Sequence, residues 1–179
     1  MDKQIQKQLV ESACNGDIGS FGKLYEHYYA TMVWLAYSIV PDYSLAEDVA
    51  QQSFAIACKN LSSLRNKEKF AGWLSAICRN AAYTNLAKSK RENVSSIDET
   101  VLACNQAGND EENKIVQQAV FSLPQMYREI VVLHYYNDMS YEQIKSALGI
   151  SLNSVKGRLR RARKKIEHYL NGRLFKEEV

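Results

Sequence analysis

Proline and glycine are scarce in this chain, which has only two prolines and eight glycines among 179 residues. Both residue types interrupt helices, so their scarcity leaves room for long continuous ones. The strict alternation of apolar and polar residues that is typical of strands is also absent. Apolar residues recur instead at steps of three and four, as they do on one face of a helix. We therefore expect an all-α protein.

Long apolar runs are missing as well. The longest candidate, residues 32–40, is followed by Pro41 and is much shorter than the roughly 20 residues that cross a bilayer. The first eight residues are polar and do not resemble a secretory signal peptide. We expect a protein without membrane insertion that stays in the cytoplasm.

The side chains that usually bind metals or catalyse reactions are scattered. The four cysteines form no CxxC pair, and the three histidines lie far apart, so the spacing of a metal site is absent. The acidic residues fall at helix caps and in a polar middle segment rather than in a catalytic cluster. We expect reduced thiols, no metal, no cofactor and no enzymatic activity.

Charge divides the chain into three parts. Residues 1–91 hold 11 Lys and Arg against 8 Asp and Glu, residues 92–113 hold none against 6, and residues 114–179 hold 12 against 6. The middle part is rich in polar residues and has few apolar ones, as linkers do. This pattern predicts two small helical domains, 1–91 and 114–179, joined by a flexible acidic linker at 92–113.

Helical periodicity continues within both parts. It predicts helices at 21–39, 46–57 and 70–86 in the first part, and at 115–123 and 127–135 in the second. We expect Glu47 and Asp48 to lie in the first turn of the helix at 46–57, where the helix dipole favours acidic residues.

A helix-turn-helix is predicted between residues 140 and 170. Ser140 and Gln143 have the spacing of a capping box at the start of the first helix. Gly149 stands where a helix C-terminus prefers a residue with positive φ, and Ser151 can cap the second helix. The second helix has an apolar face formed by Val155, Leu159, Ala162, Ile166 and Leu170. This module commonly binds DNA by inserting its second helix into the major groove.

The second helix is strongly basic, with seven Lys or Arg among residues 156–165. The alternative interpretation, a solvated basic face, leaves the repulsion between neighbouring positive charges unrelieved, whereas DNA phosphates would relieve it. The side chains expected to contact base edges are those of Lys156, Arg160 and Arg161. Those better suited to phosphates are Ser154, Arg158, Arg163 and Lys164, and Gly157 completes the predicted DNA-binding set.

Five segments form a series along the chain: residues 45–54, LAEDVAQQSF, residues 70–80, FAGWLSAICRN, residues 123–128, LPQMYR, residues 140–144, SYEQI, and residues 154–163, SVKGRLRRAR. Together they resemble the extracytoplasmic-function (ECF) family of bacterial RNA polymerase sigma factors. The first segment resembles the family's acidic segment AEDLVQETF, the second resembles its promoter-melting helix, and the last three are similar to its C-terminal domain.

The resemblance extends over about residues 10–170 and implies a function. A member of this family binds core RNA polymerase, directs it to specific promoters and aids DNA melting. Residues 1–91 would form sigma region 2, and residues 114–179 would form sigma region 4, which binds the minus-thirty-five element. The implied partners are the clamp of the polymerase's largest subunit and promoter DNA, and the resemblance also admits an anti-sigma factor.

The resemblance also assigns individual residues. The implied contacts with core polymerase are Asp48, Gln51, Gln52 and Phe54. The implied contacts with the minus-ten element, including a base flipped out of the helix, are Leu64, Trp73, Arg79 and Asn80. The chain departs from the family where Gln52 replaces a usual glutamate, Leu64 a common aromatic residue and Lys145 a small residue.

Purely structural explanations remain open for several of these residues. The charge of Asp48 also fits a helix N-terminus, and Asn80 also fits an ordinary helix surface. Phe70 and Trp73 could stack on bases, but packing in the core is favoured. At the level of the whole chain, the alternatives are a dimeric helix-turn-helix regulator with a ligand-sensing N-terminal half and an enzyme that acts on nucleic acid.

Overall fold

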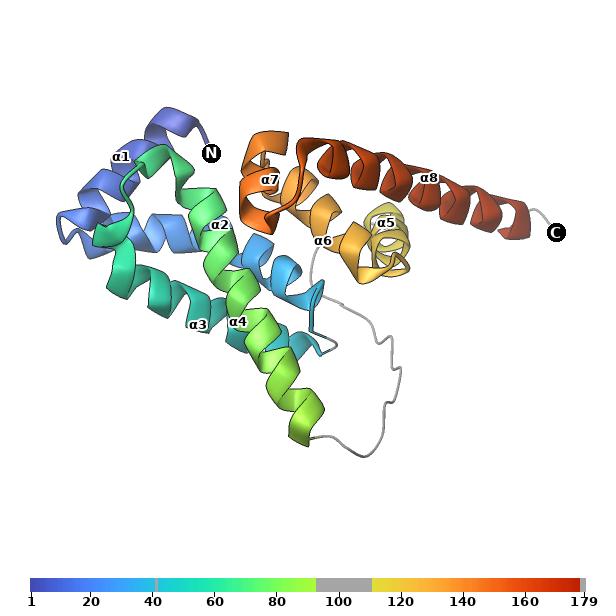
Figure 1. Ribbon diagram of the computed structural model, residues 1–179, viewed down its shortest axis with the longest axis horizontal. Coiled ribbons are helices and arrows are strands. Elements are labelled where there is room, and N and C mark those ends of the chain that lie inside the picture. The colour runs from blue at the N-terminus through green and yellow to red at the C-terminus, as the bar shows by residue number, and fades with distance from the viewer. Residues whose placement is uncertain (41, 93–110, 178–179) are drawn as a thin grey trace.

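The computed structural model describes residues 1–40, 42–92 and 111–177, and within them all regular structure is helical (Figure 1). The all-α prediction is confirmed for this part of the chain. In chain order the elements are α1 (Lys3–Cys14), α2 (Ile18–Tyr37), α3 (Tyr43–Asn60), the 3₁₀ turns η1 (Leu61–Ser63) and η2 (Lys67–Lys69), α4 (Phe70–Glu92), α5 (Glu111–Phe121), α6 (Gln125–Val131), the π-helical segment η3 (Val132–Tyr136), α7 (Tyr141–Leu148) and α8 (Leu152–Glu177).

Aspartates begin the first three helices. The carboxylates of Asp2, Asp17 and Asp42 each accept a hydrogen bond from a backbone N–H two or three residues later. These N–H groups have no partner inside the helix, so each cap stabilises its helix end. Helix α1 was not among the predicted elements. It is held partly by a buried polar side chain, since the hydroxyl of Tyr28 donates to Gln6 at 2.7 Å.

The prediction that Glu47 and Asp48 lie in the first turn of their helix is wrong. Helix α3 begins earlier, at Tyr43, because the Asp42 carboxylate caps it through the N–H of Leu45 at 2.7 Å. Both acidic residues therefore lie beyond the first turn, where the helix dipole has little effect. The dipole no longer explains the charge of Asp48.

The predicted linker at 92–113 overlaps two helices. Helix α4 continues to Glu92 and α5 begins at Glu111, so both ends of the predicted segment are helical. The rest of the predicted linker, residues 93–110, lies outside the described residues. The helix predicted at 127–135 begins at Gln125 and widens to a π-helix at Val132, where the N–H of Asn137 bonds to the carbonyl of Val132 at 3.1 Å.

The N-terminal and C-terminal halves share one apolar core. Met32 of α2 and Leu74 of α4 belong to the same buried cluster as Leu133 of η3 and Ile144 of α7. Figure 1 shows the C-terminal half lying beside α2 and α4, whereas α8 runs away from the N-terminal half. The side-by-side packing of the halves was not part of the prediction of two domains on a flexible linker.

Aromatic rings from both halves pack against each other beside α2. The ring centroid of Phe121, at the end of α5, lies 5.3 Å from that of Trp34 and 4.6 Å from that of Tyr37. Tyr136 of η3 also stacks on Trp34, with 6.0 Å between the ring centroids. Such contacts add favourable packing energy beyond the burial of apolar area.

In the part of the chain that the structure describes, no helix combines the length and the apolar character needed to cross a membrane.

Candidate nucleic-acid interface

The helix-turn-helix forms as predicted. Ser140 and Gln143 form a reciprocal capping box at the start of α7, and Gly149 at its end has a φ of 64° in the left-handed region. The hydroxyl of Ser151 then accepts the N–H of Ser154 at 3.1 Å and caps α8. The angle between the two helices is held by apolar contacts among the buried residues Ile144, Val155 and Leu159.

Helix α8 presents most of its described basic residues to solvent. Its apolar side is buried at Val155, Leu159 and Ala162, which leaves the opposite side free for charged groups. Five of the eight predicted DNA-binding residues are exposed and three are half-buried. The exposed ones are Lys156, Arg160, Arg161, Arg163 and Lys164, and the half-buried ones are Ser154, Gly157 and Arg158.

Four exposed cations of α8 have no acidic partner among the residues that the structure describes. Among the described residues, no carboxylate forms an ion pair with Lys156, Arg160, Arg161 or Lys164. Positive charges three and four residues apart on one helix repel each other, and a polyanion bound along this face would relieve that repulsion. The geometry therefore suits phosphates along the outer face of α8.

Arg163 differs from the other cations of α8. Its Nε donates to the hydroxyl of Tyr135 at 2.5 Å, and its guanidinium lies 5.6 Å from the centre of that ring. The hydrogen bond with Tyr135 raises the pKa of Arg163. In this conformation Arg163 lies on the flank of α8 next to η3 rather than on its outer face.

The predicted minus-ten residues fall into two groups. Leu64 and Trp73 line one pocket of about 670 Å³. Arg79 and Asn80 lie further along α4, and Asn80 is exposed. Phe70, one of the two rings considered for base stacking, is fully buried and packs 5.7 Å from Tyr28, so it belongs to the core.

Leu64 has little exposed surface for the base contact that the resemblance implies. Leu64 is only 6% exposed because it joins the apolar core below α4. The outer rim of the pocket is formed by α7, through Gln143, Ser146 and Ala147. The C-terminal half therefore adjoins part of the surface that the resemblance assigns to the minus-ten element, while Asn80 stays exposed.

The predicted core-polymerase contacts lie on α3. Asp48, Gln51 and Gln52 are exposed, and their spacing of three and four residues places them on one helix face. The side-chain oxygen of Gln52 accepts a hydrogen bond from Asn85 of α4 at 3.3 Å. This face is accessible to a partner.

Phe54, the fourth residue that the resemblance assigns to core polymerase, does not share that face. It is 3% exposed, and its ring centroid lies 4.7 Å from that of Tyr25 and 6.4 Å from that of Phe21. The apolar periodicity of α3 points Phe54 into the core, so it supports the exposed face from beneath.

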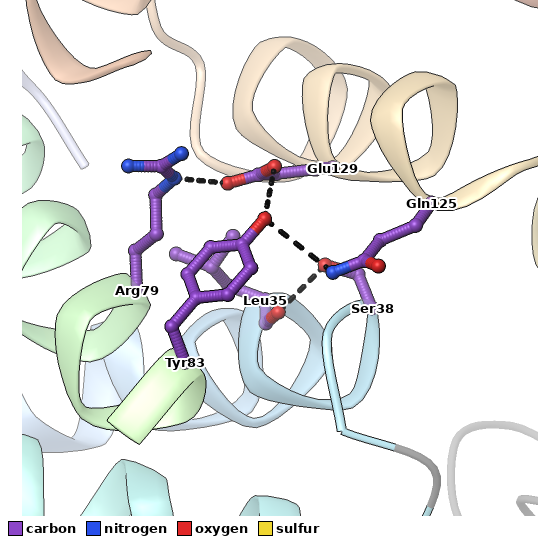
Figure 2. Close-up of polar contacts among 6 residues, drawn as sticks. All are labelled: Leu35, Ser38, Arg79, Tyr83, Gln125 and Glu129. Atoms are coloured by element: carbon purple, nitrogen blue, oxygen red, sulfur yellow. Dashed lines mark hydrogen bonds and ion pairs between the residues drawn. The ribbon is translucent and has the colours of Figure 1, made fainter. Parts of the chain in front are cut away.

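One buried acidic residue was missed by the sequence analysis. Glu129 of α6 is 4% exposed and forms an ion pair with Arg79 of α4 (Figure 2). A carboxylate directly before the apolar run at 130–133 is a weak local signal of burial. Its partner lies 50 residues away, beyond the reach of any periodicity.

Among the described residues, no group of three or more His, Cys, Asp or Glu side chains could hold a metal ion.

Two known protein families match this chain, one in its N-terminal half and one in its C-terminal half. Residues 24–92 match the family described as Sigma-70 region 2, and residues 113–166 match the family described as Sigma-70, region 4. The first match follows α2 to α4, and the second runs from α5 into the basic part of α8.

Curated relatives align with most of this chain and with most of their own length. The ECF RNA polymerase sigma-E factor of Salmonella typhimurium is 30% identical over 184 residues, covering 94% of this chain and 96% of that protein. The ECF RNA polymerase sigma factor SigW of Bacillus subtilis is 26% identical over 185 residues, covering 95% and 98%. The sigma factor RpoE of Bartonella quintana, solved with the anti-sigma factor NepR, shares the fold with a TM-score of 0.70 at 23% identity, covering 86% of this chain and 98% of that one.

Proposed function

The chain belongs to the ECF family of RNA polymerase sigma factors, and we propose that it binds core RNA polymerase and carries it to promoters through contacts from both helical halves. The observation that carries this proposal is the pairing of two features in one chain. The N-terminal half matches sigma region 2, and the C-terminal half matches region 4 and presents an exposed basic helix after a helix-turn-helix. We propose the boundaries 1–91 and 114–179 for these two functional units.

In this proposal α8 recognises the upstream promoter element. Arg161 and Arg160 contact base edges in the major groove, where Arg prefers the paired acceptors of guanine. Lys164 and Lys156, also exposed, contribute contacts to DNA. The absence of acidic partners among the described residues supports the assignment, because these cations are available to an anion without first breaking an ion pair.

The exposed face of α3 is the proposed contact with the clamp of core polymerase. Asp48 lies beyond the first turn, so its charge does not serve the helix dipole, and Gln51 and Gln52 flank it on the same face. A charge at the edge of an interface favours rapid and specific docking. The surface around Trp73 and Asn80 of α4 is the proposed contact with the minus-ten element, where a flipped base requires a pocket and polar contacts.

The chain itself is proposed to be a specificity subunit without catalytic activity, since RNA synthesis belongs to the polymerase. Its proposed place of action is the cytoplasm, where core polymerase and the chromosome are found. An anti-sigma factor is a proposed further partner, supported by the similar fold of the sigma factor solved with NepR.

Retention of core polymerase on the immobilised protein tests the proposal. The wild-type chain should retain core polymerase, and Asp48→Lys should weaken retention about tenfold, or about 1.4 kcal/mol, because it places a positive charge against a basic clamp. Glu11→Lys is the matched control, since Glu11 is an exposed acid on α1. Failure of the wild-type chain to retain core polymerase would refute the proposed function. Equal retention by both variants would refute only the role of Asp48.

A further inference from the structure

Glu129 is buried at the contact between the two halves, and its partners come from the opposite half. One carboxylate oxygen accepts from Nε of Arg79, and the other accepts from the hydroxyl of Tyr83 at 3.2 Å. Gln125, one turn before Glu129 on α6, donates to the same hydroxyl at 3.4 Å. Figure 2 shows these side chains converging from α4 and α6.

A buried carboxylate is stable only while it is paired and hydrogen-bonded. Both partners of Glu129 lie on α4, so the burial of Glu129 depends on the halves staying together. Burial and the neighbouring Glu129 charge raise the pKa of Tyr83, which keeps its phenol protonated and able to donate. When the halves separate, water can solvate both Glu129 and Arg79, so the pair favours the closed arrangement without making it permanent.

A second polar contact joins the same two halves. The amide of Asn137, after η3, donates to the hydroxyl of Ser75 on α4 at 2.9 Å, and both residues are almost fully buried. Close packing accompanies it, since a Cβ built at Gly72 of α4 would lie 3.5 Å from the methyl group of Met139. The Glu129 contacts therefore belong to a continuous interface rather than an isolated surface pair.

This interface uses surfaces that the proposed function needs elsewhere. Arg79 is one of the residues assigned to promoter DNA, and its Nε is already paired with the Glu129 carboxylate. The pocket lined by Leu64 and Trp73 is rimmed by α7 of the C-terminal half. The closed arrangement thus pairs a predicted DNA-binding cation with Glu129 and places α7 against one side of the predicted base pocket.

We propose that the contacts of Glu129 with Arg79 and Tyr83 form an autoinhibitory latch, which holds the free chain closed and keeps the minus-ten surface of α4 from nucleic acid until the halves separate. The proposal rests on the proposed function, because it assumes that α4 binds promoter DNA. The free chain then binds single-stranded DNA weakly, and its apparent affinity falls in proportion to the fraction that is open.

Two substitutions weaken the latch without touching a residue assigned to DNA or core polymerase. In Glu129→Gln the carboxamide offers only one oxygen, so either Arg79 or Tyr83 faces an N–H group instead of an acceptor. Tyr83→Phe removes one hydrogen bond and leaves the Glu129 charge in place. Glu26→Gln is the matched control, because Glu26 is an exposed acid on α2, and circular dichroism establishes that each variant keeps its helices.

The two tryptophans report on opening without any label. Trp34 packs against Phe121 and Tyr136, and Trp73 lines the pocket rimmed by α7, so separation of the halves exposes both rings. Acrylamide quenching of the intrinsic fluorescence should increase in Glu129→Gln and Tyr83→Phe and stay at the wild-type level in Glu26→Gln.

Binding of a fluorescein-labelled single-stranded DNA of random sequence supplies the functional readout. Without core polymerase, the apparent affinity should rise about tenfold in Glu129→Gln, as it would if the open fraction rose tenfold, and rise less in Tyr83→Phe. If Glu129→Gln lost its helices, Tyr83→Phe would decide the outcome alone.

Failure of the latch and failure of the proposed function give different results. If the wild-type chain retains core polymerase but the folded latch variants match it in quenching and DNA affinity, the latch is refuted and the function stands. If quenching rises without any gain in DNA affinity, the halves open but do not mask a DNA-binding surface, which also refutes the autoinhibitory role. If the wild-type chain retains no core polymerase, the proposed function fails, and the autoinhibitory role fails with it.

Discussion

Replacing Gly149 with alanine should destabilise the protein through the backbone alone. Gly149 ends α7 with φ 64° and ψ 31°, and its N–H bonds to the carbonyl of Lys145, so the turn cannot relax without losing that bond. An L residue in the left-handed region costs about 1–2 kcal/mol. A Cβ at this position would meet no atom within 4 Å, so no steric clash adds to that cost. We expect the free energy of unfolding to fall by about 1–2 kcal/mol.

Two further substitutions separate this cause from others. Gly149→Asn should cost less than Gly149→Ala, because asparagine tolerates the left-handed region better. Gly157→Ala, in α8, is the matched control, since a Cβ there would make an ordinary contact with Arg161 at 3.7 Å. Glycine inside a helix is less stable than alanine, so Gly157→Ala should raise the free energy of unfolding by about 0.5–1 kcal/mol.

Urea unfolding followed by far-ultraviolet circular dichroism measures these differences. The two alanine substitutions should shift the midpoint in opposite directions, with the slope unchanged. Equal destabilisation by both, or a neutral Gly149→Ala, would show that the left-handed turn does not determine the effect.

Three further outcomes are expected. Arg161→Ala should cost the holoenzyme about 1–3 kcal/mol at its preferred upstream element and relax the preference at one base position, whereas Lys164→Ala should weaken all sequences alike and reduce the salt dependence by about one unit of slope. Binding of the holoenzyme to variants of the upstream element across salt concentrations distinguishes these effects. The reverse pattern would mean that the wrong face of α8 has been assigned to the base edges. Burial raises the pKa of the Cys78 thiol to about 12, so mass spectrometry should find exposed Cys58 alkylated in the native protein and Cys78 alkylated only after unfolding; equal rates would contradict the packing of α4. Burial raises the pKa of Tyr83 in the folded protein, so the stability that the Tyr83 phenol contributes is present below about pH 10 and is lost as the pH rises through the folded-state pKa. Thermal unfolding should therefore show that the Tyr83→Phe variant loses less stability than the wild type when the pH is raised above about 10.

The helix-turn-helix could be predicted residue by residue because its rules are local. Ser140, Gly149 and Ser151 are chosen by hydrogen bonds and backbone angles within a few residues of each one. The apolar face of α8 could be read in the same way, since the period of a helix depends on nothing outside it.

Features that depend on contacts between distant segments could not be predicted. Periodicity contains no information that Gln6 is buried against Tyr28, and α1 was missed for that reason. Phe54 shows that a family motif can assign a role to a side chain that the helix turns into the core. The pairing of Glu129 with Arg79 exists only because the two halves pack together, which neither half specifies alone.

Run-off transcription tests the central claim, sigma factor function, most directly. Core RNA polymerase from the source organism would be supplied with genomic DNA fragments, with and without the purified chain. We predict that discrete promoter-dependent transcripts appear only when the chain is present. Transcripts made by core polymerase alone and unchanged by its addition would contradict the assignment.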